Sequence, residues 1–116
     1  VDVPNDAMGV LQDVHWSEGL FGYFPDYLLG SVLAVQIWET MLGDIPDLDE
    51  QIESGEFGAL RAWLQEHVHW SGSKFTPKET IERAVGGPLD PEPYLRYLES
   101  KIADLYGIEK GSDQWV

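Results

Sequence analysis

Side chains that could take part in chemistry gather near the amino-terminal end of this 116-residue sequence. The set comprises Gln12, Asp13, His15, Trp16, Tyr23 and Tyr27. A carboxylate beside a histidine can orient its ring. A histidine with two phenols offers hydrogen-bond donors to negative charge that develops during a reaction. Such a group is suited to the stabilisation of an oxyanion.

A simpler interpretation of the same residues is structural. The polar side chains would satisfy the end of a helix by local hydrogen bonds, and the tyrosines would pack at the edge of a core. Residue types and spacing alone favour this interpretation, because such clusters are common and neither a nucleophile nor a metal-binding motif accompanies this one.

The two remaining histidines, His67 and His69, do not form a metal site together. Residues two apart lie about 200° apart around a helix, so they cannot bind one ion from the same helix. We expect one ring at the edge of the core and the other in solvent. The sequence contains neither His-Glu-x-x-His nor an Asp-x-Asp-x-Asp-Gly loop, so we predict no self-contained metal site.

The charge balance limits the classes of partner. Seven Lys and Arg residues against 21 Asp and Glu give a net charge of −14, which argues against nucleic acid as a partner. Cysteine is absent, which excludes disulfides, thiolate zinc sites and a cysteine nucleophile. With 43% hydrophobic residues, the chain should fold as one domain without room for a second. The acidic excess suggests adaptation to high salt.

Helical signals run through the whole sequence. We expect a short helix around 6–14, then a helix that Pro25 begins and Gly43 ends. This second helix is apolar nearly all round and must be covered on every side, which suggests that part of the protein is missing. Residues 45–54 read as an acidic connection with a short helix. Four residues at spacings of 3, 4 and 4 then mark one helical face: Phe57, Leu60, Leu64 and Val68.

Two further helices carry clear end signals. Thr76 and Glu79 match a capping box, and Gly86 ends that helix. The last helix begins after Asp90 and ends at Gly107. Its expected buried face is Tyr94, Leu95, Leu98, Ile102, Leu105 and Tyr106. Two acid-first pairs should form at i,i+4 spacing: Glu79 with Arg83, and Glu92 with Arg96. Because no alternating strand pattern appears, the predicted fold class is all-α.

Nothing in the sequence indicates a membrane or an export signal. The longest uncharged stretch, 27–38, falls short of the roughly 20 residues that a spanning helix needs. No basic segment is followed by an apolar stretch at the start, so we expect a cytoplasmic protein with no membrane partner. A first residue other than Met suggests a piece of a longer chain.

One motif points to a family. Residues 9–16, GVLQDVHW, match the G-x-x-Q-D-x-H-W signature of the thermostable, Taq-type metallocarboxypeptidases. Further blocks in the same order resemble the carboxy-terminal portion of that family: 3–7, 21–27, 76–77, 88–91, 94–95 and 105–108. The resemblance covers nearly the whole chain.

The resemblance implies that residues 1–116 are the carboxy-terminal part of a larger, neurolysin-like, all-helical zinc peptidase. Such enzymes are generally homodimers that remove single residues from the carboxyl end of peptides. Their zinc is bound by the two histidines of a His-Glu-x-x-His helix and a downstream Glu. Those residues, and the family's His-Pro-Phe, Asp-x-Arg-x-Thr and Ile-Arg-x-x-Ala-Asp segments, are absent here. We therefore expect this segment to bind no zinc and to be inactive alone.

The resemblance also implies roles for the amino-terminal cluster. His15 and one of the two tyrosines would donate hydrogen bonds to the substrate or the tetrahedral intermediate, while the other tyrosine would hold the terminal carboxylate. Which of Tyr23 and Tyr27 does which stays open. Gln12 and Asp13 would support the site, with Asp13 fixing the His15 ring. Trp16 is expected to pack, and His69 to be structural.

A function from another class is a non-catalytic, acidic helical interaction module that uses exposed Trp and Tyr side chains as anchors. It differs from the first hypothesis in an observable way. A reading frame that starts near Val1 would favour the module, and an upstream His-Glu-x-x-His would exclude it.

Overall fold

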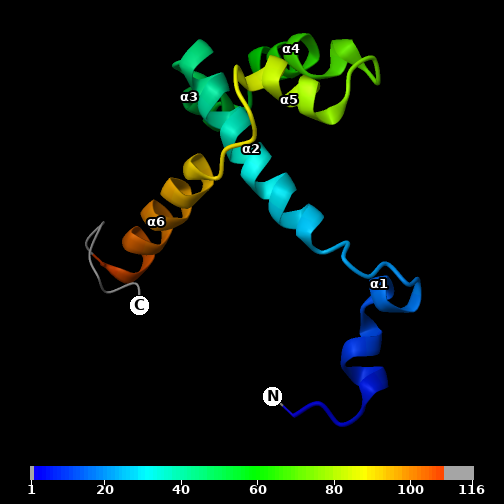
Figure 1. Ribbon diagram of the computed structural model, residues 1–116. Coiled ribbons are helices and arrows are strands. Elements are labelled where there is room, and N and C mark those ends of the chain that lie inside the picture. Colours follow the sequence, from blue (N-terminus) through cyan, green and yellow to red (C-terminus); the bar gives the residue numbers. More distant parts are fainter. Residues whose placement is uncertain (1, 109–116) are drawn as a thin grey trace. The chain divides into compact units, whose positions relative to one another are not determined.

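The computed structural model describes residues 2–108 and divides the chain into two compact units, Val1–Gly30 and Ser31–Val116 (Figure 1). Every regular element in the described part is a helix, and no strand occurs there. The predicted all-α class is therefore confirmed.

Short helical turns make up the amino-terminal unit. Two 3₁₀ turns, Asp6–Met8 and Val10–Gln12, precede α1 at Val14–Ser17. The prediction of one helix around 6–14 is wrong, because the backbone leaves the helical region at Gly9 (φ −122°, ψ −116°) and again at Asp13 (φ −85°, ψ 116°). Asp13 instead caps a new helix by accepting the backbone N–H of His15.

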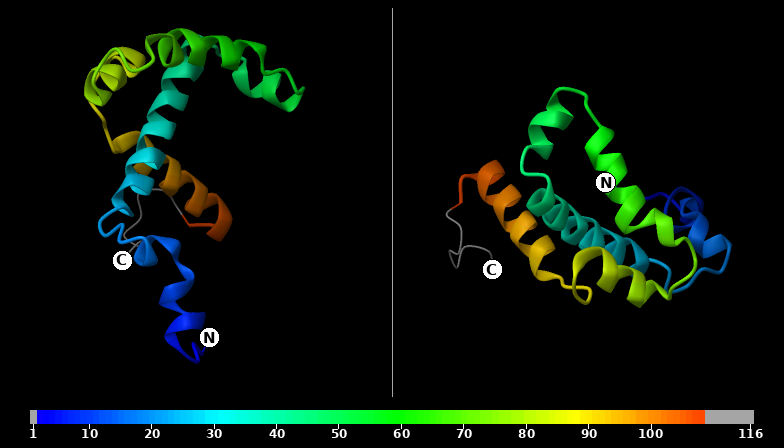
Figure 2. Two further views of the ribbon diagram at one scale, coloured as in Figure 1. Left: turned by 90° about the vertical axis from the view of Figure 1, so that its right-hand side faces the viewer. Right: turned by 90° about the horizontal axis from the view of Figure 1, so that it is seen from above.

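The hydrophobic core lies in the carboxy-terminal unit. It forms where the second half of α2 (Pro25–Asp44) meets α3 (Leu48–Glu53) and α4 (Gly58–His67), which lie at the top end of α2 in the left view of Figure 2. The buried centre consists of Met41, Leu48 and Trp63. Of the four residues on the helical face predicted for this region, Leu60, Leu64 and Val68 pack directly on the buried centre. Phe57 does not share that burial, because it precedes α4 and is 55% exposed.

Trp63 fixes α4 to α2 by a polar contact as well as by burial. Its indole Nε1 donates to Asp44 Oδ2 at 2.7 Å, which satisfies the one polar atom of a ring that is otherwise buried. The His67 ring stacks on the indole with centroids 4.2 Å apart, and His67 Nδ1 lies 3.0 Å from the Trp63 carbonyl oxygen. His67 thus lies at the core edge. His69, in the 3₁₀ turn His69–Ser71, is exposed, so one of the two histidines is at the core edge and the other in solvent, as expected.

The last two helices follow their predicted end signals. α5 (Pro77–Val85) begins with a complete capping box between Thr76 and Glu79, and Gly86 ends it with a left-handed φ of 77°. α6 spans Glu92–Tyr106. The side chain of Gln36 in α2 ties down the loop between them, because it donates to the Pro88 carbonyl (2.8 Å) and accepts from the Asp90 N–H (3.0 Å).

Other contacts take up most of the side chains of the two predicted i,i+4 ion pairs, although the charge of Arg83 still contributes to the lowered pKa of Glu79 after the hydrogen bonds from Thr76. Arg96 extends from α6 to Glu39 of α2, with 2.7 Å between Nη2 and Oε2, so it is not the partner of Glu92. Glu79 accepts hydrogen bonds from Thr76, while the Arg83 guanidinium lies 4.0 Å from the centroid of the Phe75 ring. In both cases a tertiary or capping contact outweighs the weak pairing along one helix.

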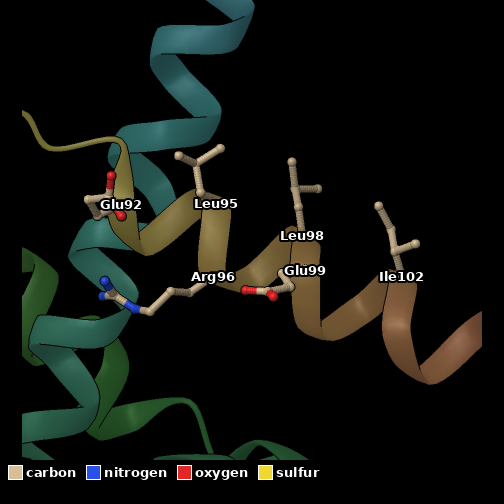
Figure 3. Close-up of a pocket in the computed structure, with 6 residues that line it drawn as sticks. All are labelled: Glu92, Leu95, Arg96, Leu98, Glu99 and Ile102. Atoms are coloured by element: carbon tan, nitrogen blue, oxygen red, sulfur yellow. The ribbon is translucent and has the colours of Figure 1, made fainter. Parts of the chain in front are cut away.

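Large apolar faces of α2 and α6 lie open. The predicted burial of this face of α6 is wrong, because Leu95 is 52% exposed, Leu105 70% and Tyr106 75%. Figure 3 shows Leu95, Leu98 and Ile102 projecting along one side of the helix, where with Glu92, Arg96 and Glu99 they line an open hollow. These faces are uncovered because no described element packs over them. In the part of the chain described, no helix is both long and apolar enough to cross a bilayer.

Candidate functional site

The histidine singled out from the sequence lies at the centre of a ring cluster in the amino-terminal unit. Asp13 Oδ1 accepts the backbone N–H of His15 at 2.8 Å and lies 2.6 Å from His15 Nδ1. One carboxylate oxygen therefore caps α1 and orients the imidazole. The His15 side chain is only 18% exposed, in a unit whose described residues are all at least partly exposed.

Both candidate tyrosines contact the His15 ring, each in a different way. The Tyr27 hydroxyl lies 2.9 Å from His15 Nε2, and the two rings meet edge to face. The Tyr23 ring stacks on the imidazole, with centroids 5.2 Å apart and planes 26° from parallel. Tyr27 thus contacts the histidine through its polar atom, whereas Tyr23 contacts it through its face.

The loop between α1 and α2 brings these residues together. Gly19 and Gly22 adopt φ values of 70° and 83°, which a residue with a side chain rarely adopts, and this lets the chain turn sharply after α1. The Leu20 N–H donates to the His15 carbonyl at 2.8 Å and holds the start of the turn. α2 then begins at Pro25, and its first turn brings the Tyr27 ring edge to face against the Tyr23 ring, with centroids 5.6 Å apart.

The electrostatics of the cluster define the hydrogen-bond directions. The pKa of Asp13 lies below its usual value, first because Oδ1 accepts the His15 backbone N–H and second because it contacts the His15 ring. An ionised carboxylate only accepts hydrogen bonds, so His15 Nδ1 carries a proton. In the neutral ring, Nε2 is then an acceptor, and the Tyr27 O–H donates to it.

The other two predicted site residues lie farther from the histidine. The Gln12 side-chain amide donates to the Ala7 carbonyl, so it links the two 3₁₀ turns. The Trp16 ring packs against Phe21 and Phe24, with centroids 5.5 Å and 5.8 Å away. The structure brings Asp13, His15, Tyr23 and Tyr27 into one contact group and places Gln12 and Trp16 at its margin.

Sequence reasoning did not single out Phe24. The centroid of its ring lies 5.1 Å from that of the His15 ring, and the ring also contacts Trp16 and Tyr27. Phe24 therefore connects Trp16 to the His15–Tyr27 pair. The available signal was its position next to Tyr23 within the block 21–27, but an apolar ring carries no chemical feature that marks it as part of a polar site.

The described residues do not supply a metal site. Among residues 2–108, no three His, Cys, Asp or Glu side chains are grouped so that they could hold an ion. Each of the three histidines has a different environment. His15 contacts Asp13 and Tyr27, His67 stacks on Trp63, and His69 is exposed. A zinc ion therefore has no ligand set in this part of the chain.

Comparisons with known proteins agree with the signature in residues 9–16. Residues 1–102 match the model of a family described as carboxypeptidase Taq (M32) metallopeptidase. Carboxypeptidase 1 of Bacillus subtilis is 45% identical over 101 residues, which cover 87% of this chain and 20% of the relative. Thermostable carboxypeptidase 1 of Pyrococcus furiosus is 41% identical over 93 residues, or 80% of this chain and 19% of the relative.

Solved structures lead to the same group of proteins. A structure titled "BsuCP Crystal Structure" matches with a TM-score of 0.81 at 42% identity, covering 91% of this chain and 21% of that one. An M32 carboxypeptidase from Deinococcus radiodurans R1 matches with a TM-score of 0.81 at 41% identity, covering 92% and 22%. The chain thus spans about a fifth of the length of the curated relatives it matches.

Proposed function

Because the chain belongs to the carboxypeptidase Taq (M32) metallopeptidase family, we propose that it is the carboxy-terminal segment of a zinc metallocarboxypeptidase. The full enzyme would release single amino acids from the carboxyl end of peptides. The carrying observation is the placement of the signature residues: Asp13 and His15 of the G-x-x-Q-D-x-H-W motif contact each other and the Tyr27 hydroxyl. Family membership does not favour the alternative of a non-catalytic interaction module.

In this proposal the segment forms a wall of the substrate groove. Asp13 fixes the imidazole, and the group of His15, Tyr23 and Tyr27 donates hydrogen bonds to oxygen atoms of the peptide or of the tetrahedral intermediate. Phe24 supports the His15 ring by packing, and Trp16 packs in turn against Phe24. Gln12 acts farther out, by holding the 3₁₀ turns that precede the motif.

Zinc belongs to this function, but residues 2–108 offer no ligand set for it. When bound in the full enzyme, the metal supplies polarisation of the scissile carbonyl and an activated water. The ligands would come from the rest of the polypeptide, which is also the first partner we propose for this segment. The open apolar faces of α2 and α6 support that proposal, because they need a cover. A homodimer remains a prediction from the resemblance, and a cytoplasmic location remains a prediction from the sequence.

The test is a histidine replacement in the full-length, zinc-loaded enzyme. His15→Ala should lower kcat/KM by about a hundredfold, the usual loss when one donor to an oxyanion is removed. His69→Ala is the matched control, since that exposed histidine has no place in the proposed site and should leave kcat/KM unchanged. An unchanged kcat/KM for His15→Ala would remove the cluster from the mechanism.

A second measurement addresses the segment by itself. The purified 116-residue chain should release no amino acid from peptides even with added zinc, because its described residues offer no ligand set and its sequence has no His-Glu-x-x-His. Zinc-dependent release of carboxy-terminal residues by this chain would contradict the proposed division of labour.

A further inference from the structure

Gly30 lies inside α2, where a glycine is unfavourable. In a helix interior, glycine lowers the folding equilibrium constant about fivefold relative to alanine, because its more flexible backbone has to be ordered. Elsewhere the chain shows why it uses glycine. Gly86 ends α5 with a left-handed φ of 77°, and a Cβ on Gly9 would lie 2.6 Å from Val3 Cγ1. Neither reason applies to Gly30.

The described residues contain nothing that requires glycine at position 30. Its φ is not positive, and α2 continues through the residue without a break. A Cβ built on Gly30 would meet no atom within 4 Å outside its own helix backbone and chain neighbours. The residue is also exposed. Within residues 2–108, alanine would therefore suit this position better than glycine.

The helix surface that leads to Gly30 is apolar and open. Residues 27–29, which are Tyr, Leu and Leu, are 55%, 57% and 49% exposed. No charged residue occurs in the stretch 27–38. A helix surface that faces water carries charged and polar side chains, so this one is suited to contact with protein.

The rest of the full-length polypeptide is the occupant that these observations favour. The chain spans about a fifth of the length of its curated relatives, so about four fifths of such a protein lie outside it. A peptide that binds and leaves would expose this apolar surface to water in every cycle, whereas a helix of the same polypeptide covers it permanently. Two helix axes approach most closely where a glycine leaves no side chain between them.

We propose that a helix from the remaining part of the full-length polypeptide crosses α2 at Gly30, with its backbone against the glycine and an apolar face on residues 27–29. The inference rests on the proposed function, in which the rest of the polypeptide is the partner of this segment, and it assigns the place of contact. Because residues three apart are neighbours on a helix surface, the crossing lies beside Tyr27 and borders the proposed groove wall.

The first experiment adds a methyl group in the full-length, zinc-loaded enzyme. The half-time for loss of the far-UV circular dichroism signal at a fixed high temperature reports the rate of unfolding. On an open helix surface Gly30→Ala would lengthen this half-time, since alanine is the better helix former. Under a close crossing it should shorten the half-time by about fivefold or more, and Gly30→Leu should shorten it further, because a packed contact does not accept extra volume.

Gly43→Ala is the matched control for this substitution. Gly43 is also an exposed glycine of α2, and a Cβ on it would likewise meet no atom within 4 Å. In the full-length enzyme Gly43→Ala should keep or lengthen the half-time. An equal shortening at Gly43 and Gly30 would overturn the crossing, because the effect would then not depend on the position in α2.

The same substitution should have the opposite effect in the 116-residue chain. The crossing helix is missing there, so Gly30→Ala should increase the helical circular dichroism signal. A decrease would place the close neighbour of Gly30 within this chain and would overturn the proposal.

Other occupants of the surface give different results. If a second copy of the protein covers Gly30, Gly30→Ala shifts the sedimentation of the full-length enzyme toward the monomer, and the shortened half-time depends on protein concentration. If the peptide substrate lies there, Gly30→Ala raises KM without shortening the half-time. Either result overturns the crossing by a helix of the same polypeptide.

The outcomes also separate the crossing from the proposed function. A half-time that Gly30→Ala leaves unchanged or lengthens overturns the crossing, while a loss of kcat/KM of about a hundredfold in His15→Ala would still support the groove wall. A shortened half-time together with an unchanged kcat/KM in His15→Ala supports the crossing and removes the cluster from the mechanism. A full-length Gly30→Ala that does not fold, beside a Gly43→Ala that does, also supports the crossing.

Discussion

Leu48 and Leu95 offer a sharp test of which surfaces this chain covers by itself. Leu48 is 0% exposed at the centre of the core, whereas Leu95 is 52% exposed on the open face of α6. Truncation of a fully buried leucine to alanine costs about 3 to 5 kcal/mol, because transfer energy is lost and a cavity remains. For Leu95 about half of the side chain is already in water, so Leu95→Ala in the 116-residue chain should cost about 1 kcal/mol.

The comparison between the isolated chain and the full-length enzyme carries the prediction further. Urea-induced unfolding followed by far-UV circular dichroism gives the free energy for each variant. Leu48→Ala should cost about the same in both proteins, since its neighbours belong to this chain. Leu95→Ala should rise to about 3 kcal/mol in the full enzyme if the rest of the polypeptide covers α6. A Leu95→Ala cost that is equal in both proteins would refute the idea of a missing cover, and a Leu48→Ala cost below about 1 kcal/mol would refute the core assignment.

Three further predictions concern helix capping, acid and salt. Thr76→Ala should lower the free energy of unfolding by about 1 kcal/mol while Thr76→Ser keeps it, measured in urea; equal values for the two variants would contradict the capping role. The pKa of Glu79 is lowered first by the Thr76 backbone N–H and then by its hydroxyl, so Glu79 stabilises the fold above its unfolded pKa and this contribution fades as the pH falls below about 4.5. Glu79→Gln should therefore weaken the acid dependence of the melting temperature, and an unaltered acid limb would exclude this contribution. With a net charge of −14, stability should increase between about 0.1 M and 1 M KCl as the Debye length falls from about 10 to 3 Å; a flat response would argue against adaptation to high salt.

Local signals were enough to predict the ends of α5 and α6, but not the breaks at Gly9 and Asp13 in the helix expected around 6–14. The capping box at Thr76 and the left-handed Gly86 depend on a few adjacent residues, so the sequence contains all the information that they need. Contacts between distant residues were not predictable in this way. Arg96 pairs with Glu39, 57 positions away, and Gln36 binds the loop at Pro88 and Asp90. Helical periodicity identified the apolar face of α6, but it does not say whether the same chain provides the partner for that face.

The candidate site shows the same division. The identity of its polar residues came from the motif in residues 9–16 and the tyrosines that follow it, whereas their mutual geometry depends on a loop that two glycines turn. That geometry distinguishes Tyr27, which meets His15 through its hydroxyl, from Tyr23, which stacks. Spacing alone left the two tyrosines equivalent. Phe24 escaped attention because ring packing has no sequence signature apart from position.

The double use of one oxygen atom in Asp13 links the stability of α1 to the orientation of the His15 ring. Oδ1 holds the first turn of a four-residue helix and also holds the imidazole that follows it. Fraying of that turn therefore releases the ring, although the core around Leu48 stays intact. Gentle heating should release the His15 ring at temperatures where most of the helical circular dichroism signal persists. The same coupling restricts which residues can replace Asp13 during evolution, because the replacement must accept hydrogen bonds from both the backbone amide and the imidazole of His15.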